Sequence, residues 1–385
     1  MSGTNYSKNT KRRLKPKYKN IAVILAALLL IISGTSYALS SSRTAPPPAD
    51  DTLEQDGGSQ LPSVELPSPP EEEPVDVDPA ETDPTNQNSY YFDFVSMTEA
   101  DLGTGELVLV NNMIKFRGSV NEEELLVVRD NKNSSYMVSD RNVMLLPSAM
   151  NALNEMLGDF FAATGNNGVM ARSGYRTVEY QQELYEDDLA SSGANSSTLV
   201  AMPGYSEHHT GLVVDFTTYN SQTDSYREFD GTGDFAWIME NCHRYGFINR
   251  YPEGKEKLTL IDNEPWHFRY VGIPHASIMK DYDFCLEEYI DFIKNYTIDS
   301  GFLLKDTDDG ARYIVYYVPL SSGETTAVYH PKKHGSDEFY PYSISGNNVD
   351  GFIVTVQLRE PSQPAVPDNT VEAAGSDSQT AQDNS

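Results

Sequence analysis

The feature that most limits how this chain can fold is a carboxylate inside an apolar strand. Residues 206–216 read SEHHTGLVVDF, and strand alternation places Leu212, Val214 and Phe216 on one face. Asp215 then lies on the opposite face of the same strand. A buried carboxylate is costly unless it is paired or bound to a cation. Asp215 therefore needs a specific partner.

Two adjacent histidines precede this strand. Thr210 and Gly211 can form a bend that brings His208 or His209 beside Asp215. Neutral imidazole and carboxylate are ordinary zinc ligands, so such a pair can share one metal ion. The alternative is a histidine–aspartate hydrogen bond that only fixes the hairpin.

A second stretch, NEPWHFRYVG at 263–272, adds the groups that a catalytic zinc site requires. Glu264 precedes a proline and is therefore biased toward extended backbone, and His267 lies in the aromatic strand that follows. A catalytic zinc site uses three protein ligands and a carboxylate that takes a proton from water. His208, Asp215 and His267 would be the ligands. Glu264 would be the base, unless it is a surface carboxylate and His267 an ordinary strand histidine.

A third stretch, ARSGYRTVEYQQ at 171–182, contains an arginine where a helix is expected to begin. Arg176 directly precedes Thr177, and a cation at a helix N-terminus is electrostatically unfavourable. A fixed guanidinium can hold a carboxylate or stabilise a developing oxyanion. The alternative is a surface arginine stacked on Tyr175.

Charge is distributed unevenly along the chain. Its formal net charge is −29, yet residues 1–20 hold seven basic residues and no acidic one, so the remainder is more acidic still. This argues against nucleic acid as a partner.

Residues 21–39 carry no charge and, as a helix, would span roughly 28 Å, about the thickness of a bilayer core. The basic flank then predicts a membrane anchor with the rest of the chain exported. The alternative is a cleaved signal peptide ending near residues 36–38.

Composition divides the rest of the chain. Residues 41–88 contain ten prolines and twelve acidic residues, which predicts a disordered linker, and residues 362–385 predict a disordered tail. Helices are expected at 147–164, from 177 onward and at 234–245, and strands near 107–112, 123–130, 212–217 and 266–271. Four further strands after residue 300 predict a small β unit over 300–361, following an α+β domain over 90–299.

Cys242 and Cys285 are too few for a disulfide framework, and Cys242 is expected to be a buried hydrophobe.

Three motifs, in this order, resemble the VanY-type D-alanyl-D-alanine carboxypeptidases, which are zinc peptidases of peptidoglycan. They are S-G-Y-R-T-x-x-x-Q at 173–181, S-x-H-x-x-G-x-x-x-D at 206–215 and E-P-W-H-F-R-Y-V-G at 264–272. The resemblance covers roughly residues 105–285. It implies a compact α+β zinc-peptidase domain in which helices flank a central antiparallel sheet.

The resemblance also implies roles for single residues. It implies one zinc ion per chain, held by three ligands: His208, Asp215 and His267. Glu264 matches the catalytic base, and Arg176 matches the arginine that steadies the substrate carbonyl. Gln181 and Ser206 match positions near the terminal residue of the substrate. His209 falls on a variable position, which favours His208 as the ligand.

The expected function is therefore a zinc-dependent carboxypeptidase that removes the terminal D-Ala from peptidoglycan stem peptides outside the cell membrane. One alternative is an L,D-carboxypeptidase acting on tetrapeptide stems. Another is a non-catalytic wall-binding module, although a structural metal site would need neither Glu264 nor Arg176. A serine penicillin-binding enzyme is disfavoured because no S-x-x-K motif occurs with its partner motifs.

Overall fold

The structure, a computed structural model, describes residues 90–197, 199–333 and 336–362. In these ranges no helix is both long enough and apolar enough to cross a membrane. Four predicted segments fall on residues outside the description, wholly or almost wholly: the basic segment 1–20, the anchor or signal peptide 21–39, the linker 41–88 and the tail 362–385.

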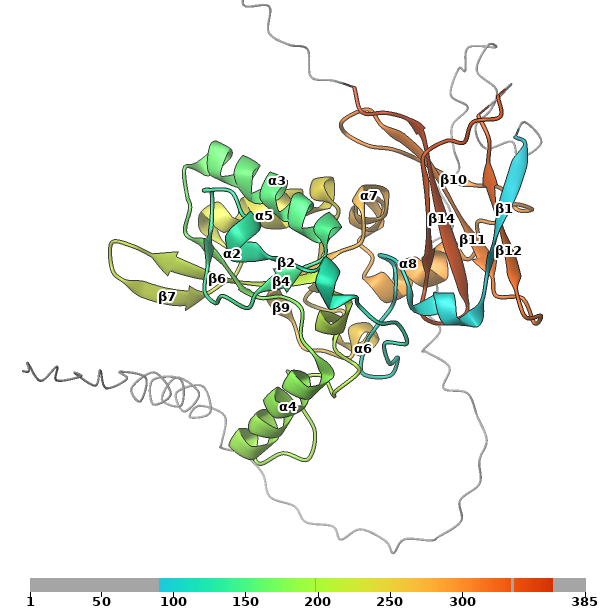
Figure 1. The fold of residues 1–385 in the computed structure, drawn as a ribbon. Coiled ribbons are helices and arrows are strands. Elements are labelled where there is room, and N and C mark those ends of the chain that lie inside the picture. The colour runs from blue at the N-terminus through green and yellow to red at the C-terminus, as the bar shows by residue number, and fades with distance from the viewer. Residues whose placement is uncertain (1–89, 198, 334–335, 363–385) are drawn as a thin grey trace, which may run out of the picture. The chain divides into compact units, whose positions relative to one another are not determined.

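The central sheet (Figure 1) carries three of the residues singled out in the sequence, Asp215, Glu264 and His267. Its strands run in the order β3-β5-β6-β9-β8, and β7 pairs with β6. The bounds are β3 Met137–Val138, β5 Val169–Ser173, β6 Val213–Asn220, β7 Ser225–Glu228, β8 Phe247–Tyr251 and β9 Glu264–Tyr270. Among these pairings only β3 with β5 is parallel. The α+β fold with a central, mainly antiparallel sheet is confirmed, and β6 and β9 lie where strands were expected.

Helix α3 (Pro147–Thr164) covers one face of this sheet, together with α5 (Ala236–Asn241). α3 ends at Gly165, whose φ of 70° is the left-handed conformation that glycine adopts easily. An apolar stripe of the helix packs against β5, β6 and β9. This core includes Leu153, Met156, Leu157 and Phe160 of α3, Val214 and Phe216 of β6, and Phe268 of β9. Phe161 was expected in this stripe but is 40% exposed, because it lies beyond the sheet-facing edge of the helix.

The remaining helices are short, apart from α4. Their bounds are α2 Val128–Asn131, α4 Val178–Ser192, α6 Glu256–Thr259, α7 Ile273–Tyr282 and α8 Leu286–Ile293, with 3₁₀ turns at Glu99–Gly103, Glu122–Glu124, Glu207–Thr210, Gly233–Phe235 and Cys242–Tyr245. α4 begins after Thr177, whose hydroxyl accepts a hydrogen bond from the backbone of Tyr180, as expected for a helix N-cap. Cys242 and Cys285 are both buried and unpaired.

A second, four-stranded sheet forms the C-terminal part of the chain in the order β10-β11-β14-β13. The bounds are β10 Leu303–Asp306, β11 Arg312–Pro319, β13 Tyr342–Gly346 and β14 Gly351–Arg359. The two faces of β11 pack into different hydrophobic cores. Val315 and Tyr317 pack with α7 and α8. Ile314 and Tyr316 pack with Val328 of β12.

β12 (Thr326–Pro331) pairs not with its sequence neighbours but with β1 (Phe92–Met97). β1 belongs by sequence to the region 90–299, so the strands of the C-terminal unit include residues from the start of the described chain. The division at residue 300 remains a prediction.

One strand prediction is wrong and a second is correct only in part. Residues 107–110 are buried but form no strand, because side chains and one backbone carbonyl, that of Asn347, bond to their backbone in place of a paired strand. Arg269 donates to the carbonyl of Val108 at 3.0 Å, and the amide of Asn348 donates to the carbonyl of Leu109 at 2.8 Å. In the stretch 123–130, the strand is limited to β2 (Leu126–Val127), which pairs with β4 (Met144–Leu145) before the chain turns into α2.

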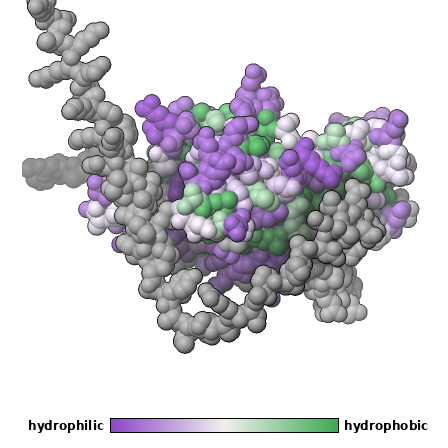
Figure 2. All heavy atoms as spheres, turned by 90° about the horizontal axis from the view of Figure 1, so that it is seen from below, coloured by the Kyte–Doolittle hydropathy of each residue, from purple (hydrophilic) through white to green (hydrophobic). Residues whose placement is uncertain are grey.

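α4 differs from the other long helix because it buries almost no apolar surface. Its one buried side chain is Gln181. Val178 and Tyr180 are exposed, as are Leu199 and Met202 in the segment that follows the helix. The face viewed from below, toward which α4 extends in Figure 1, is largely hydrophilic with smaller hydrophobic areas (Figure 2). Because α4 has so little apolar packing, the polar contacts of Gln181, described below, hold this helix in place.

Candidate active site

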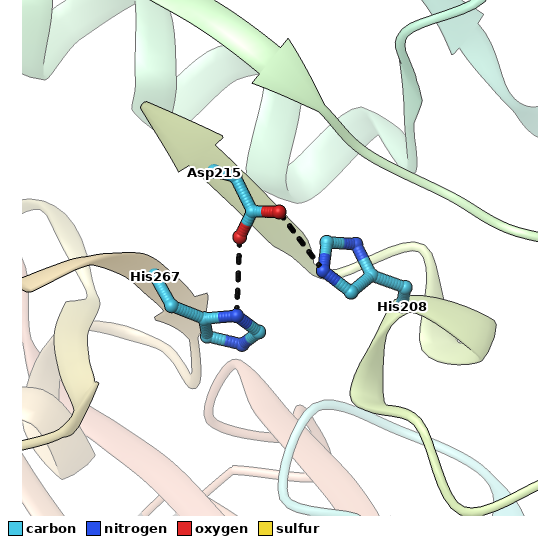
Figure 3. Close-up of side chains that lie close together, drawn as sticks. All are labelled: His208, Asp215 and His267. Atoms are coloured by element: carbon cyan, nitrogen blue, oxygen red, sulfur yellow. Dashed lines mark ion pairs between the residues drawn. The ribbon is translucent and has the colours of Figure 1, made fainter. Parts of the chain in front are cut away.

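Asp215 and His267 meet because their strands are paired. Asp215 of β6 lies directly opposite His267 of β9, and on its other side it lies opposite Ser173 of β5. Directly opposed residues of antiparallel strands project to the same face. The three side chains therefore form a row across the sheet, on the face away from the α3 core. Asp215 Oδ1 lies 3.1 Å from His267 Nδ1 (Figure 3).

His208 reaches this row from the 3₁₀ turn Glu207–Thr210 that leads into β6. The turn ends at Gly211, where a φ of 69° reverses the chain at little steric cost. His208 Nδ1 lies 2.6 Å from the carbonyl oxygen of Gly174. A carbonyl can only accept, so Nδ1 carries the proton and Nε2 presents its lone pair. That Nε2 lies 3.3 Å from Asp215 Oδ2.

These three residues form a candidate metal site. One ligand atom from each of His208, Asp215 and His267 lies within 4.8 Å of the others, and the two imidazole rings are nearly perpendicular at 85°. All three side chains are buried. Asp215 Oδ1 is a buried oxygen without a hydrogen bond in the described structure. Two imidazoles and a carboxylate with an unsatisfied oxygen fit a divalent metal ion of the zinc type.

Burial and charge act differently on the three groups. Burial lowers the pKa of His208 to about 4, which keeps the imidazole neutral. Burial would also lower the pKa of His267, but Asp215 and Glu207 raise it to about 9. Burial would raise the pKa of Asp215, but the neighbouring histidines hold it well below its usual value. The site therefore carries an ionised carboxylate that attracts a cation.

Glu264 lies at the start of β9, and its Oε2 is 3.4 Å from His267 Nδ1. The side chain is buried, and burial raises the pKa of Glu264 to about 7. A carboxyl group with a pKa near neutrality can both accept and release a proton, which suits general acid–base catalysis.

Arg176 lies just before α4 and points into the same site. Its Nη2 donates to Asp215 Oδ2 at 2.9 Å. Its Nε and Nη2 both donate to the hydroxyl of Ser173, at 3.0 and 2.9 Å. The sequence alternative, a surface arginine stacked on Tyr175, is not what the structure shows, because the Arg176 side chain is only 17% exposed and bonds to the strands.

Gln181 and Ser206 form hydrogen bonds to two residues of the site, Arg176 and His208. Gln181 is fully buried, accepts from Arg176 Nη1 at 3.3 Å and donates to the carbonyl of Ala201 at 2.8 Å. Ser206 accepts from the backbone of His208 at 3.3 Å and so caps the 3₁₀ turn. The expected substrate contacts of both residues remain predictions.

His209 faces away from the metal site. Its Nδ1 donates to the carbonyl of Arg176 at 2.8 Å, and its Nε2 accepts from the amide of Gly204 at 3.0 Å. These two hydrogen bonds connect the 3₁₀ turn to the backbone at Arg176, just before α4, and at Gly204.

Sequence reasoning missed Glu207, which lies between Ser206 and His208. It is fully buried, with Oε1 bound by Arg250 and Arg269 and with Oε2 3.5 Å from His267 Nε2. Glu207 could have been inferred from the kind of signal that pointed to Asp215, namely a charged residue inside an apolar strand. Arg250 and Arg269 each lie inside an apolar strand and require a buried partner.

Comparison with known proteins agrees with these features. The VanY family, D-alanyl-D-alanine carboxypeptidase, matches residues 142–273, a range that includes every candidate site residue named above. A D-alanyl-D-alanine carboxypeptidase of Enterococcus faecium is 36% identical over 264 residues, which cover 68% of this chain and 78% of the relative. The bifunctional D-Ala-D-Ala dipeptidase and D-Ala-D-Ala carboxypeptidase VanXYC of Enterococcus gallinarum is 36% identical over 159 residues, covering 40% of this chain and 82% of the relative.

A solved structure is similar over most of the described residues. The vancomycin resistance D,D-dipeptidase VanXYg, crystallised with a D-Ala-D-Ala phosphinate analogue, superimposes with a TM-score of 0.60 at 31% identity. The match covers 69% of this chain and 99% of the VanXYg chain. On these similarities, the chain belongs to the VanY family of D-alanyl-D-alanine carboxypeptidases.

Proposed function

We propose that this chain is a zinc-dependent D-alanyl-D-alanine carboxypeptidase that removes the terminal D-Ala of peptidoglycan stem peptides. The observation that carries the proposal is the convergence of His208, Asp215 and His267 within 4.8 Å, with Glu264 beside them. In such a site, zinc supplies Lewis acidity toward the peptide carbonyl and lowers the pKa of water. The three side chains would hold the ion through His208 Nε2, a carboxylate oxygen and His267 Nδ1.

Glu264 would handle the proton. Its carboxylate lies 3.4 Å from His267 Nδ1, where it can take a proton from water and pass it to the leaving amine. The raised pKa of about 7 supports this role, because a glutamate with the ordinary pKa of 4.5 would be a weaker base toward water near neutral pH.

Arg176 would stabilise the carbonyl oxygen of the scissile bond. Its guanidinium is held by Ser173 and Gln181 and can turn one N–H group toward charge that develops beside Asp215. A structural metal site would require neither this arginine nor Glu264, which counts against a non-catalytic wall-binding module.

Dipeptidase activity is a second candidate. It is favoured by the similarity to VanXYC, a bifunctional dipeptidase and carboxypeptidase, and to VanXYg, a D,D-dipeptidase. The L,D alternative, removal of D-Ala from tetrapeptide stems, requires the same metal chemistry and differs only in substrate recognition.

We also propose that the catalytic part lies outside the cell membrane. The support comes from the sequence alone: a basic segment 1–20 followed by the charge-free segment 21–39. The mature N-terminus, sequenced from the membrane fraction, would distinguish an anchor from a cleaved signal peptide.

The substrate assignment is tested by mass spectrometry of four compounds incubated with the zinc-loaded protein. They are a pentapeptide stem ending in D-Ala-D-Ala, the tetrapeptide, the C-terminally amidated pentapeptide and free D-Ala-D-Ala. We expect loss of one alanine from the free pentapeptide. Hydrolysis of free D-Ala-D-Ala alone would favour the dipeptidase, and loss from the tetrapeptide alone would favour the L,D alternative. Equal cleavage of the amidated peptide would reject carboxypeptidase action.

A further inference from the structure

A buried network of charges lies behind His267, on the side of the ring away from Asp215. Glu207 Oε1 accepts from Arg250 Nε at 2.9 Å and from Arg269 Nη1 at 2.7 Å. Arg250 also donates twice to Glu287 of α8, at 2.8 and 2.6 Å. All four side chains are at most 5% exposed. Buried ions are retained at a large desolvation cost, which only close pairing can offset.

The two oxygens of Glu207 have different surroundings. Oε1 receives both arginine hydrogen bonds, whereas Oε2 is buried and has no hydrogen bond in the described structure. The atom that faces Oε2 is His267 Nε2, which is also buried and also lacks a hydrogen bond. The two unsatisfied atoms are 3.5 Å apart. A pair of buried polar atoms without other partners indicates an interaction that closes with a small movement of either side chain.

The other ring nitrogen already has its own environment. His267 Nδ1 faces Asp215 Oδ1 at 3.1 Å and Glu264 Oε2 at 3.4 Å. If Nδ1 is to bind a metal, it must lose its proton, and the proton that the neutral ring keeps must lie on Nε2. Glu207 Oε2 is the acceptor placed to receive it.

We propose that Glu207 is a positioning residue for His267: it accepts the Nε2–H hydrogen bond and thereby directs the Nδ1 lone pair toward the metal position. This inference rests on the metal site of the proposed function and deepens it. Outer carboxylate partners of this kind fix the tautomer and orientation of a ligating histidine. Arg250 and Arg269 hold the carboxylate in place through their hydrogen bonds to Oε1.

The decisive substitution is Glu207→Gln, which preserves size and shape. Both arginines can only donate, so they will bind the amide oxygen of the glutamine. The amide NH₂ group then faces His267 Nε2 and donates to it, which favours a proton on Nδ1 and so the wrong tautomer for metal binding. A similar exchange of carboxylate for amide behind a catalytic histidine is known to fix the wrong tautomer.

A matched control is Glu287→Gln. Glu287 binds the same Arg250 but does not contact His267. Both variants remove one negative charge from the same network. A merely structural role for Glu207 predicts similar behaviour of the two variants, whereas a positioning role predicts that only Glu207→Gln affects the metal.

The test measures zinc affinity by chelator competition, with zinc as the sole ligand, in the wild type and both variants. We expect the dissociation constant to rise about 10–100-fold in Glu207→Gln and to stay within about threefold of wild type in Glu287→Gln. Equal affinities in the wild type and a folded Glu207→Gln would overturn the inference. Failure of the wild type itself to bind zinc would instead overturn the proposed function.

A second measurement needs no variant. Nitrogen-15 NMR of the zinc-loaded wild type reports which nitrogen of His267 carries the proton and whether that proton exchanges slowly with water. We expect a slowly exchanging proton on Nε2, shifted downfield by its hydrogen bond to Glu207. A proton on Nδ1, or a rapidly exchanging one on Nε2, would contradict the role of Glu207 even if Glu207→Gln fails to fold.

Discussion

Asp215 and His267 lie directly opposite each other on antiparallel strands, with Asp215 Oδ1 3.1 Å from His267 Nδ1. The pairing of β6 with β9 thus sets the distance between two candidate ligands through backbone hydrogen bonds rather than through flexible loops. A shift of one residue in this register would move one of the two side chains to the opposite face of the sheet. The placement of these two candidate ligands is therefore a property of the sheet itself.

Glu264 should affect turnover and not metal content. We expect Glu264→Gln to bind zinc as the wild type does and to lower kcat by about 10²–10⁴-fold, the usual contribution of a positioned acid–base group. The amide cannot take up the proton but fills the same space. Steady-state release of D-alanine, combined with elemental analysis, checks this. Activity within a few-fold of wild type would place the base elsewhere.

Arg176 should be replaceable by no other cation. We expect Arg176→Lys to lower kcat by about 10²–10³-fold, because lysine cannot reproduce the forked contacts to Ser173 and Asp215 while donating to a substrate oxygen. Arg172→Lys, an exposed substitution on the same strand as Ser173, is the control and should be nearly neutral. Equal kcat values for the two variants would remove Arg176 from the reaction.

Arg250 should be essential for stability. We expect Arg250→Met to lower the free energy of unfolding by about 3–5 kcal/mol, because it leaves Glu287 as an uncompensated buried charge and leaves Glu207 paired with Arg269 alone. Arg312→Met is the comparison, since Arg312 pairs with the half-exposed Asp306, and such a pair contributes about 1 kcal/mol at most. Urea denaturation measures both. Similar losses in the two variants would show that the buried network adds no special stability.

His275 should make stability depend on pH. It is buried between the hydroxyls of Tyr289 on α8 and Thr355 on β14, and burial lowers its pKa to about 3. In the unfolded chain the pKa is about 6.5, so below that pH unfolding takes up a proton and the folded state loses stability as the pH falls.

The change is measured relative to His275→Gln, which lacks the titrating group but can still form a hydrogen bond. We expect the stability of the wild type, minus that of the variant, to fall by up to about 1.4 kcal/mol per pH unit between pH 5.5 and 4.5. Denaturant midpoints at several pH values provide the difference. A difference that stays constant over this range would show that His275 is protonated equally in both states.

Much of the fold and most of the candidate site could be predicted from local sequence. α3 has a proline at its start, an apolar stripe and a glycine after its end, and each of these signals acts over a few residues. β6 and β9 follow from alternation, and the charged residues within them drew attention because a buried charge needs a partner. The structure then places His208, Asp215 and His267 together.

Other features depend on contacts between distant residues. β1 pairs with β12 across more than two hundred residues, and no local pattern specifies that partner. Residues 107–110 resemble a strand, but Arg269 and Asn348 satisfy their carbonyls in place of a strand. Glu207 was missed because the direction of a side chain on a single 3₁₀ turn cannot be derived from alternation.

The metal assignment is tested by the zinc content of the purified protein, determined by elemental analysis in the wild type and in His267→Ala. We expect one zinc ion per wild-type chain and almost none in the variant, with the fold of the variant checked by circular dichroism. A folded His267→Ala protein that keeps one zinc ion per chain, or a wild type that binds none after reconstitution, would contradict this assignment.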